Sequence, residues 1–214
     1  MLPAKNKRII DLTHSLSNSM EGVDILPAKT IAKDGWNATT LQLYSHVGTH
    51  MDAPLHFNVT DRTIDTIPPE RLITKAWVVQ VKDVHPSCLI TISDMEPIAD
   101  KIQKGDSVLL HTGWSKKLHT TAYRDELPRI SEALAHWLGE KQVGLLGVEP
   151  PSVADVNNLE EVTKIHTILM KNDIIIVEGL TNLDQLTKDQ VTLISLPLKV
   201  ENGDGAPARI LAIE

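Results

Sequence analysis

Seven short apolar runs, each rich in Ile, Val or Leu, constrain the fold of this chain more than any other feature. Runs of this length, bounded by Gly, Pro, Asn or Asp, are typical of β-strands. Two of them, LLGV and IIIV, suit strands that are buried on both faces of a sheet. Aromatic residues make up only 3% of the chain, so the core must be mainly aliphatic. The expected strands are residues 8–12, 76–81, 107–111, 143–148, 174–177, 191–196 and 209–213.

Three segments between these runs have helical patterns and recognisable ends. Asn158 can cap a helix over 159–171, and Glu160 and Glu161 are favourable in its first turn. Helices are also expected over 94–103 and over 131–138, each followed by a glycine stop signal. No repeat or linker divides the chain. The sequence therefore predicts a mixed α/β fold, with more strands than helices, in a single domain over 1–214.

Charge and cysteine content exclude several classes of function. Lys and Arg total 21 against 28 Asp and Glu, which gives a net charge of −7. We therefore expect neither nucleic-acid binding nor attraction to anionic membranes. Cys88 is the only cysteine, and neither a signal peptide nor a run of about 20 apolar residues is apparent. These features favour a cytoplasmic protein.

The segment SHVGTHMDAPLHF carries three histidines and an aspartate within one short stretch. Gly48 and Pro54 argue against a helix through it. In an extended chain, residues two apart point the same way, so His50 and Asp52 are expected side by side. Gly48 permits a tight turn that could bring His46 beside them. Two imidazoles and a carboxylate suit zinc, manganese or iron.

Candidates that could complete such a site lie elsewhere in the chain. His56 is a further polar group just beyond the proline. His166 lies near the apolar face of the 159–171 helix, and Glu178 ends an apolar strand. Taken singly, His166 and Glu178 are better explained by structural roles. Taken with the loop, three imidazoles and two carboxylates are enough for two adjacent divalent ions.

Such a site points to hydrolysis. Two divalent cations lower the pKa of bound water and polarise a substrate carbonyl. Neither GxGxxG nor GxxxxGK[ST] occurs in the chain, so no nucleotide-binding loop is indicated.

The run HVGTHMDAPLHF resembles the HxGTHxDxPxHF signature of the metal-dependent cyclase family, which includes bacterial kynurenine formamidase and isatin hydrolase. The resemblance extends over nearly the whole chain, through IIDLTHSLS, LLHTGW, GVEPPSV and LPLKVENGDGAPAR. It implies a swivelling β/β/α domain and two divalent ions per subunit, zinc or manganese. It also implies homodimers or homotetramers whose neighbouring subunits border the active site.

The resemblance assigns roles residue by residue. Asp52 is implied to be shared between the two metals, and His56 to be the general acid/base. The implied metal ligands are His46, His50, Asp52, His166 and Glu178.

We therefore expect a metal-dependent hydrolase of a small amide, cyclic amide or N-formyl compound, with metal-activated water. Kynurenine formamidase proper is the nearest alternative. The segment SNSMEGVDILP lacks the aromatic residue that those enzymes generally carry, which favours a smaller or more polar substrate. Trp36, Trp77 and Trp114 are expected to be packing residues.

Two alternatives come from other classes. His50, Asp52 and His166 could form the facial triad of an iron(II) oxygenase, although no arginine follows the distal histidine at the usual distance. A non-catalytic metal-binding protein is the other alternative.

Overall fold

The computed structural model describes residues 7–214. Its main sheet contains the seven strands that the apolar runs predict and one more, β4, from the histidine segment. The bounds are β1 (Ile9–Asp11), β4 (His50–Asp52), β5 (Ile73–Gln80), β7 (Ser107–His111), β9 (Leu145–Val148), β10 (Ile175–Glu178), β11 (Gln190–Pro197) and β12 (Gly205–Ile213).

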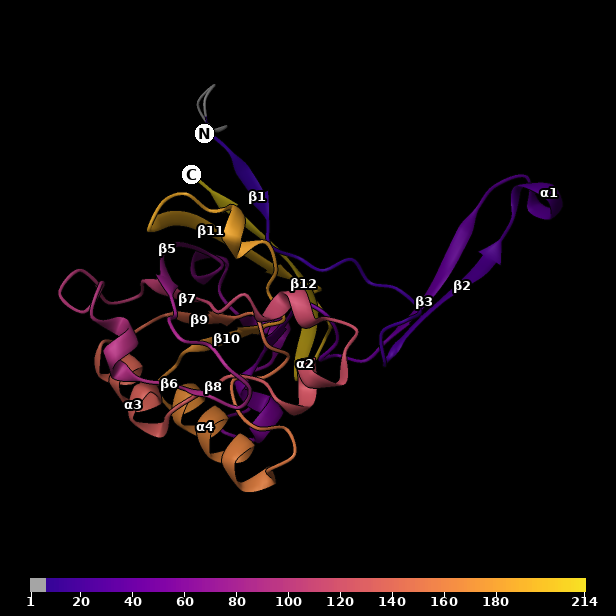
Figure 1. Ribbon diagram of the computed structural model, residues 1–214. Helices are drawn as coiled ribbons and strands as arrows, with labels where there is room; N and C mark the ends of the chain where they lie inside the picture. Colours follow the sequence, from indigo (N-terminus) through magenta and orange to yellow (C-terminus); the bar gives the residue numbers. More distant parts are fainter. Residues whose placement is uncertain (1–6) are drawn as a thin grey trace.

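Seven of these strands form a closed barrel (Figure 1). The order is β12-β11-β5-β7-β9-β10-β4, and β4 pairs back to β12. Strands β5, β7, β9 and β10 run parallel, whereas the other pairs of the ring are antiparallel. The short strand β4 therefore closes the ring, and β1 extends the sheet beside β12.

Side-chain alternation along the strands produces two separate hydrophobic clusters. Leu109 and Val177 point into the barrel, where small side chains such as Ala206 and Ala212 leave room for them. The next residue after Leu109, Leu110, points outward and packs in the second cluster, beneath two helices. Those helices are α3 (Glu132–Glu140) and α4 (Leu159–Lys171), which cover one side of the barrel (Figure 1).

The helix predictions hold for α4 and largely for α3. Asn158 caps α4 by accepting a hydrogen bond from Glu161 N at 3.1 Å. Helix α3 runs through Gly139, which was expected to stop it. A Cβ at this position would collide with the side chain of Asn172, so the glycine serves close packing.

The expected helix over 94–103 is wrong. The chain forms only a 3₁₀ turn there, η4 (Ile92–Met95), followed by turns. Pro97 accounts for the difference, because it has no N–H to continue the helical hydrogen bonds and its ring would clash with the carbonyl one turn earlier.

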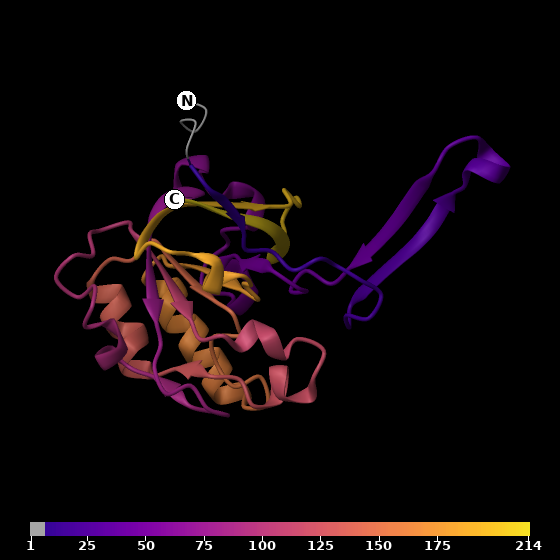
Figure 2. The same ribbon diagram turned by 45° about the horizontal axis from the view of Figure 1, so that its top comes forward.

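A hairpin projects from the barrel and was not predicted. It consists of β2 (Val23–Lys29) and β3 (Ala38–Leu43), with the short helix α1 (Ile31–Asp34) at its tip. Both views show this arm extending away from the rest of the chain (Figures 1 and 2). Trp36 lies near the tip and is 58% exposed, so the expectation that it is a packing residue is wrong. Trp77 and Trp114 do pack as expected.

The remaining elements are short. They are β6 (Leu89–Ile90), β8 (Arg129–Ile130), α2 (Thr121–Asp125), η1 (Pro54–Phe57), η2 (Ile64–Thr66), η3 (Pro69–Arg71), η5 (Trp114–Lys117) and η6 (Leu183–Gln185). Within residues 7–214, no helix has the length and apolar character required to cross a bilayer.

Candidate metal centre

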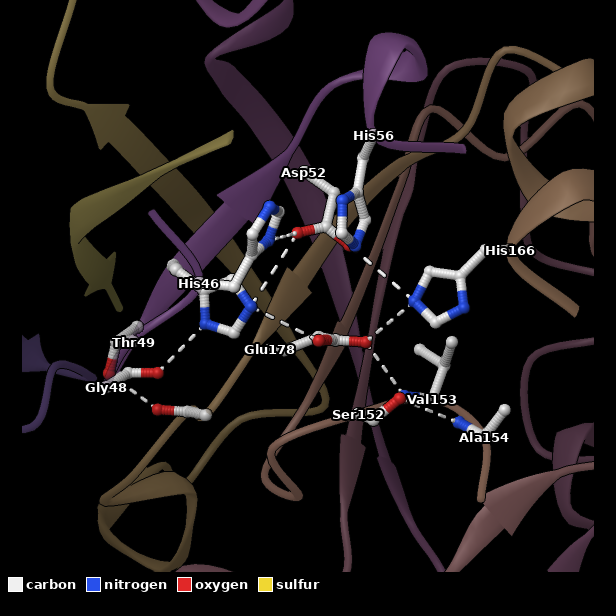
Figure 3. Close-up of polar contacts among 12 residues, drawn as sticks. His46, Gly48, Thr49, Asp52, His56, Ser152, Val153, Ala154, His166 and Glu178 are labelled. Carbon is white, nitrogen blue, oxygen red and sulfur yellow. Dashed lines mark hydrogen bonds and ion pairs between the residues drawn. The ribbon is translucent and has the colours of Figure 1, made fainter. Parts of the chain in front are cut away.

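Six side chains that the sequence singles out lie together on the outer surface of the barrel, where β4 and β10 face α4 (Figure 3). Four of them are only 2–4% exposed, although each can carry a charge. Burying such groups is costly unless they are paired or bind a cation. The six residues are His46, His50, Asp52, His56, His166 and Glu178.

Strand β4 brings two of these side chains to one face of the sheet, as predicted. His50 and Asp52 point outward, while Met51 between them points into the barrel. The antiparallel register places His50 directly opposite Glu178. His50 Nε2 lies 3.6 Å from Asp52 Oδ1.

Two glycines and a threonine fix the turn that leads into β4. Gly179 has a φ of 67°, and a Cβ there would collide with the carbonyl of Gly48. The buried Thr49 hydroxyl donates to the Gly179 carbonyl at 2.5 Å and accepts from the His14 amide at 2.9 Å. The start of β4 is thereby tied to the residue after Glu178.

The hydrogen bonds of His50 and His166 define which ring nitrogen faces the site. His50 Nδ1 donates to the Gly48 carbonyl at 3.0 Å, and His166 Nδ1 donates to the Val162 carbonyl at 2.7 Å. Both Nε2 atoms then point towards Glu178, at 3.2 and 3.3 Å. A lone pair aimed at a carboxylate requires a proton or a cation between them. Metal-ligating histidines are typically oriented in this way, by a hydrogen bond from the other nitrogen.

Glu178 is the charged centre of this half of the site. Its Oε1 also accepts a hydrogen bond from Val153 N at 2.8 Å. Burial would raise the pKa of its carboxyl, but the His166 and His50 rings beside it hold that pKa well below its usual range. Burial lowers the pKa of each imidazole, yet the contact with Glu178 gives both a net upward shift. The pocket therefore retains a carboxylate and favours positive charge around it.

His46 and His56 form the other half. The His46 ring lies between two carboxylates, with Nδ1 2.9 Å from Asp52 Oδ1 and Nε2 3.0 Å from Asp204 Oδ2. Burial opposes protonation, but these hydrogen bonds raise the pKa of His46 to about 9. The His56 ring stacks on it at a centroid distance of 3.8 Å, and burial lowers the pKa of His56.

These residues fit divalent cations. His50 Nε2 and Asp52 Oδ2 are buried and lack a hydrogen-bond partner, as expected of atoms that bind a metal. The all-nitrogen and oxygen donor set suits zinc or manganese. Two groups of potential ligands share Asp52, and within each the ligand atoms lie within 4.8 Å of one another. The groups are His46, Asp52 and His56, and His50, Asp52 and Glu178.

Comparison with known proteins identifies the family of this chain. The family model described as "Putative cyclase" matches residues 10–155, which is more than half of the chain. The chain belongs to the cyclase family. It is 32% identical over 174 residues to a kynurenine formamidase of Bacillus cereus (strain ATCC 10987 / NRS 248), covering 81% of this chain and 78% of the relative.

Solved structures of other cyclase-like proteins share the fold. Isatin hydrolase A from Ralstonia solanacearum superposes with a TM-score of 0.86 at 26% identity, covering 97% of this chain and 92% of that one. A protein from Bacillus stearothermophilus described as a predicted metal-dependent hydrolase gives a TM-score of 0.77 at 26% identity, with coverages of 97% and 98%. The family resemblance inferred from the sequence is thus confirmed, whereas the individual residue roles stay predictions.

Two further motifs of the family resemblance have a structural explanation. Glu149, from GVEPPSV, is 1% exposed, and its carboxylate accepts hydrogen bonds from the Thr112 amide and hydroxyl, from Gly113 N and from the Ser115 hydroxyl. These partners lie in and just after LLHTGW. The carboxylate therefore connects the carboxyl-terminal ends of β7 and β9. Glu178 lies at the same end of the neighbouring parallel strand β10.

Sequence reasoning missed Asp204. Its carboxylate contacts His46 and lies 3.6 Å from His56 Nδ1. The only signal was its place in LPLKVENGDGAPAR, a run noted for the family resemblance without a role for the aspartate.

Proposed function

We propose that this cyclase-family protein is a metal-dependent hydrolase that cleaves a non-peptide C–N bond, in a small amide, a cyclic amide or an N-formyl compound. The observation that carries the proposal is the buried cluster of histidines and two carboxylates with unpartnered Nε2 and Oδ2 atoms. The names of the relatives, kynurenine formamidase and isatin hydrolase, support the same bond type.

The residues of the chain would have separate roles in this reaction. Bound cations would supply Lewis acidity and lower the pKa of bound water. The residues that would hold and orient the cations are His46, His50, Asp52, His166 and Glu178.

His56 is suited to proton transfer. Its side chain is 25% exposed, so it can reach both solvent and substrate at the open side of the cluster. It would accept a proton from the attacking water and deliver it to the departing nitrogen.

We propose two divalent ions per chain, zinc or manganese. The support is that Asp52 belongs to both ligand groups. Purified protein should contain about two equivalents by elemental analysis, and Asp52→Ala or His50→Ala should lower that number. Metal content unchanged in both variants would contradict the ligand assignment.

His56→Ala separates catalysis from metal binding. We expect this variant to keep its metal but to lose turnover by about 10²-fold or more, as is usual for a general acid/base. Wild-type turnover in this variant would remove His56 from the mechanism.

The substrate is tested with a panel of N-formylkynurenine, simple formamides, isatin-like lactams and cyclic imides. We expect a smaller or more polar substrate than formylkynurenine, because the segment SNSMEGVDILP lacks an aromatic residue. Hydrolysis of any panel member by the metal-loaded protein would support the proposal. Full metal content with no hydrolysis would favour a binding protein, and iron-dependent oxygen uptake would favour an oxygenase.

We further propose that the protein is a homodimer held by the projecting arm. One face of the arm carries Val23, Ile25, Leu41 and Leu43, which pair across the two strands. An isolated two-stranded hairpin is only marginally stable in water, so this face requires a partner.

The extent of the exposed apolar surface supports a second copy as that partner. Five large side chains of the arm and its base are each more than half exposed: Leu26, Ile31, Trp36, Leu41 and Tyr44. Together they offer roughly 500 Å², a large part of the about 800 Å² per partner in a standard interface. The barrel itself exposes Ile9, Ile73 and Leu196, which could receive an arm.

Charge substitution on and off the arm tests the dimer. Leu41→Lys lies on the apolar face of the arm and should give monomers by light scattering, whereas Glu140→Lys, exposed at the end of α3, should leave dimers. A monomeric wild type, or a Leu41→Lys variant that remains dimeric, would refute the proposal.

We make three further proposals about fold class, domain number and location. We assign the barrel with its helices to the swivelling β/β/α class, and residues 1–214 to a single domain. The unpaired Cys88 supports a cytoplasmic location.

A further inference from the structure

We propose that Asp204 and Gly205 form a cradle that sets the orientation and tautomer of His46, with Asp204 as a positioning residue. The inference rests on the proposed metal-dependent function. It adds a residue pair from β12 and its preceding loop to a site otherwise built from β4, the turn before it, η1, α4 and β10.

The carboxylate of Asp204 determines which nitrogen of His46 is available. Asp52 lies on the Nδ1 side of the ring, and Asp204 lies on the Nε2 side. Asp52 is shared by both ligand groups, so Nδ1 must offer its lone pair on that side when a cation is bound. The single proton of the neutral ring then resides on Nε2 and is donated to Asp204. Carboxylates commonly orient metal-ligating histidines in this way.

Gly205 provides the space that the His46 ring occupies. A Cβ at this position would lie 2.6 Å from Cε1 of His46 and 2.8 Å from the Met51 carbonyl oxygen. Such distances are far below van der Waals contact. Any side chain at 205 would therefore push the ring out of its position between Asp52 and Asp204.

The barrel itself holds the cradle in register. Gly205 pairs with Asp52 where β12 meets β4, and Ala53 N donates to the Asp204 carbonyl at 2.9 Å. The cradle and the ligand Asp52 thus sit on adjacent strands. The pairing of β12 with β4 that closes the barrel therefore also places Asp204 and Gly205 against His46.

The cradle also reaches the proposed proton-transfer residue. Asp204 Oδ2 lies 3.6 Å from His56 Nδ1, and the two imidazoles stack. One carboxylate oxygen therefore faces a nitrogen of each ring and keeps them side by side.

Metal affinity, measured by competition with a chromogenic chelator, tests the inference independently of turnover. Asp204→Ala removes the hydrogen-bond acceptor and should weaken binding of one of the two ions by about 10–100-fold. Asp204→Asn keeps an acceptor oxygen and should restore most of that affinity. Gly205→Ala should weaken the same ion, because the added methyl displaces the His46 ring.

Asp65→Ala is the matched control. Asp65 accepts a hydrogen bond from Asn202 N and so anchors the same loop without contacting His46. This variant loses that anchor but should bind both ions as the wild type does. Equal loss of both ions in Asp65→Ala and Asp204→Ala would show a general loop effect and overturn the inference.

Two other results would also overturn it. Wild-type affinity for both ions in Asp204→Ala and Gly205→Ala would refute the positioning role of these two residues and leave the proposed function intact. A wild-type protein that binds no divalent ion would overturn both proposals.

Discussion

Thr49→Val should destabilise the protein strongly although it preserves the volume of the side chain. Thr49 is 2% exposed, and its hydroxyl makes two hydrogen bonds, donating to the Gly179 carbonyl and accepting from the His14 amide. Valine leaves both backbone groups without this partner. An unsatisfied buried polar group costs about 1–3 kcal/mol. Because the His14 amide is only partly buried, we expect a total loss of roughly 2–4 kcal/mol.

Urea denaturation of the metal-free protein gives this loss directly. Thr49→Ser is the matched control, because it keeps the hydroxyl and loses only a methyl group, at a cost of about 1 kcal/mol. The melting temperature of Thr49→Val should fall by roughly 4–16 °C for a protein of this size. If Thr49→Val were as stable as Thr49→Ser, the hydroxyl would not be the link between β4 and the residue after Glu178, and the reasoning would fail.

The remaining predictions concern a helix cap and an ion pair. Asn158→Ala removes the acceptor for Glu161 N and should lower the free energy of unfolding by about 1 kcal/mol; an unchanged denaturation midpoint would contradict the capping role. Burial raises the pKa of Asp173, but hydrogen bonds from Arg62 and Arg71 give it a net downward shift. Its stabilisation is therefore present above pH about 4 and lost as the pH falls through the lowered pKa. Asp173→Asn should cost up to about 1 kcal/mol at pH 7, and this difference should shrink as the pH falls through the lowered pKa; a pH-independent difference would contradict the ion pair.

Local sequence patterns were sufficient where local interactions determine the structure. The apolar runs became strands because their alternation matches two cores, and α4 begins at the residue that its cap specifies. The prediction failed over 94–103, where Pro97 outweighs an apparently helical pattern. It also failed at Gly139, because the packing against Asn172 that requires a glycine is not visible in the sequence.

The arm could not be predicted for a different reason. Its strands alternate apolar and polar residues over only a few positions. Val23 at the base of the arm is buried, but the arm contributes to neither hydrophobic cluster of residues 7–214. We propose that a second copy of the chain covers this face, and a single sequence carries no pattern that identifies such a surface. For the same reason the sequence alone suggests a packing role for Trp36, which the structure shows to be exposed.

For the site, spacing within the histidine segment predicted the common face of His50 and Asp52, because an extended strand fixes it. The helix face and the strand end placed His166 and Glu178 among the candidates, although neither signal was specific by itself. Asp204 was missed because its contact with His46 spans 158 residues. Only the pairing of β12 with β4 brings them together.

This pairing explains why the candidate ligands lie where they do. Strand β4 has only three residues, and just one of them, Met51, contributes an apolar side chain to the barrel interior. Yet β4 must pair on both sides to close the ring. Its outward positions are filled by His50 and Asp52, which add little hydrophobic stabilisation and bring charge into a buried place. A cation could be bound by these residues together with Glu178 on one neighbouring strand and His46 against the other. It would stabilise the short β4 pairing that closes the barrel. Metal binding and barrel closure are therefore expected to be thermodynamically coupled.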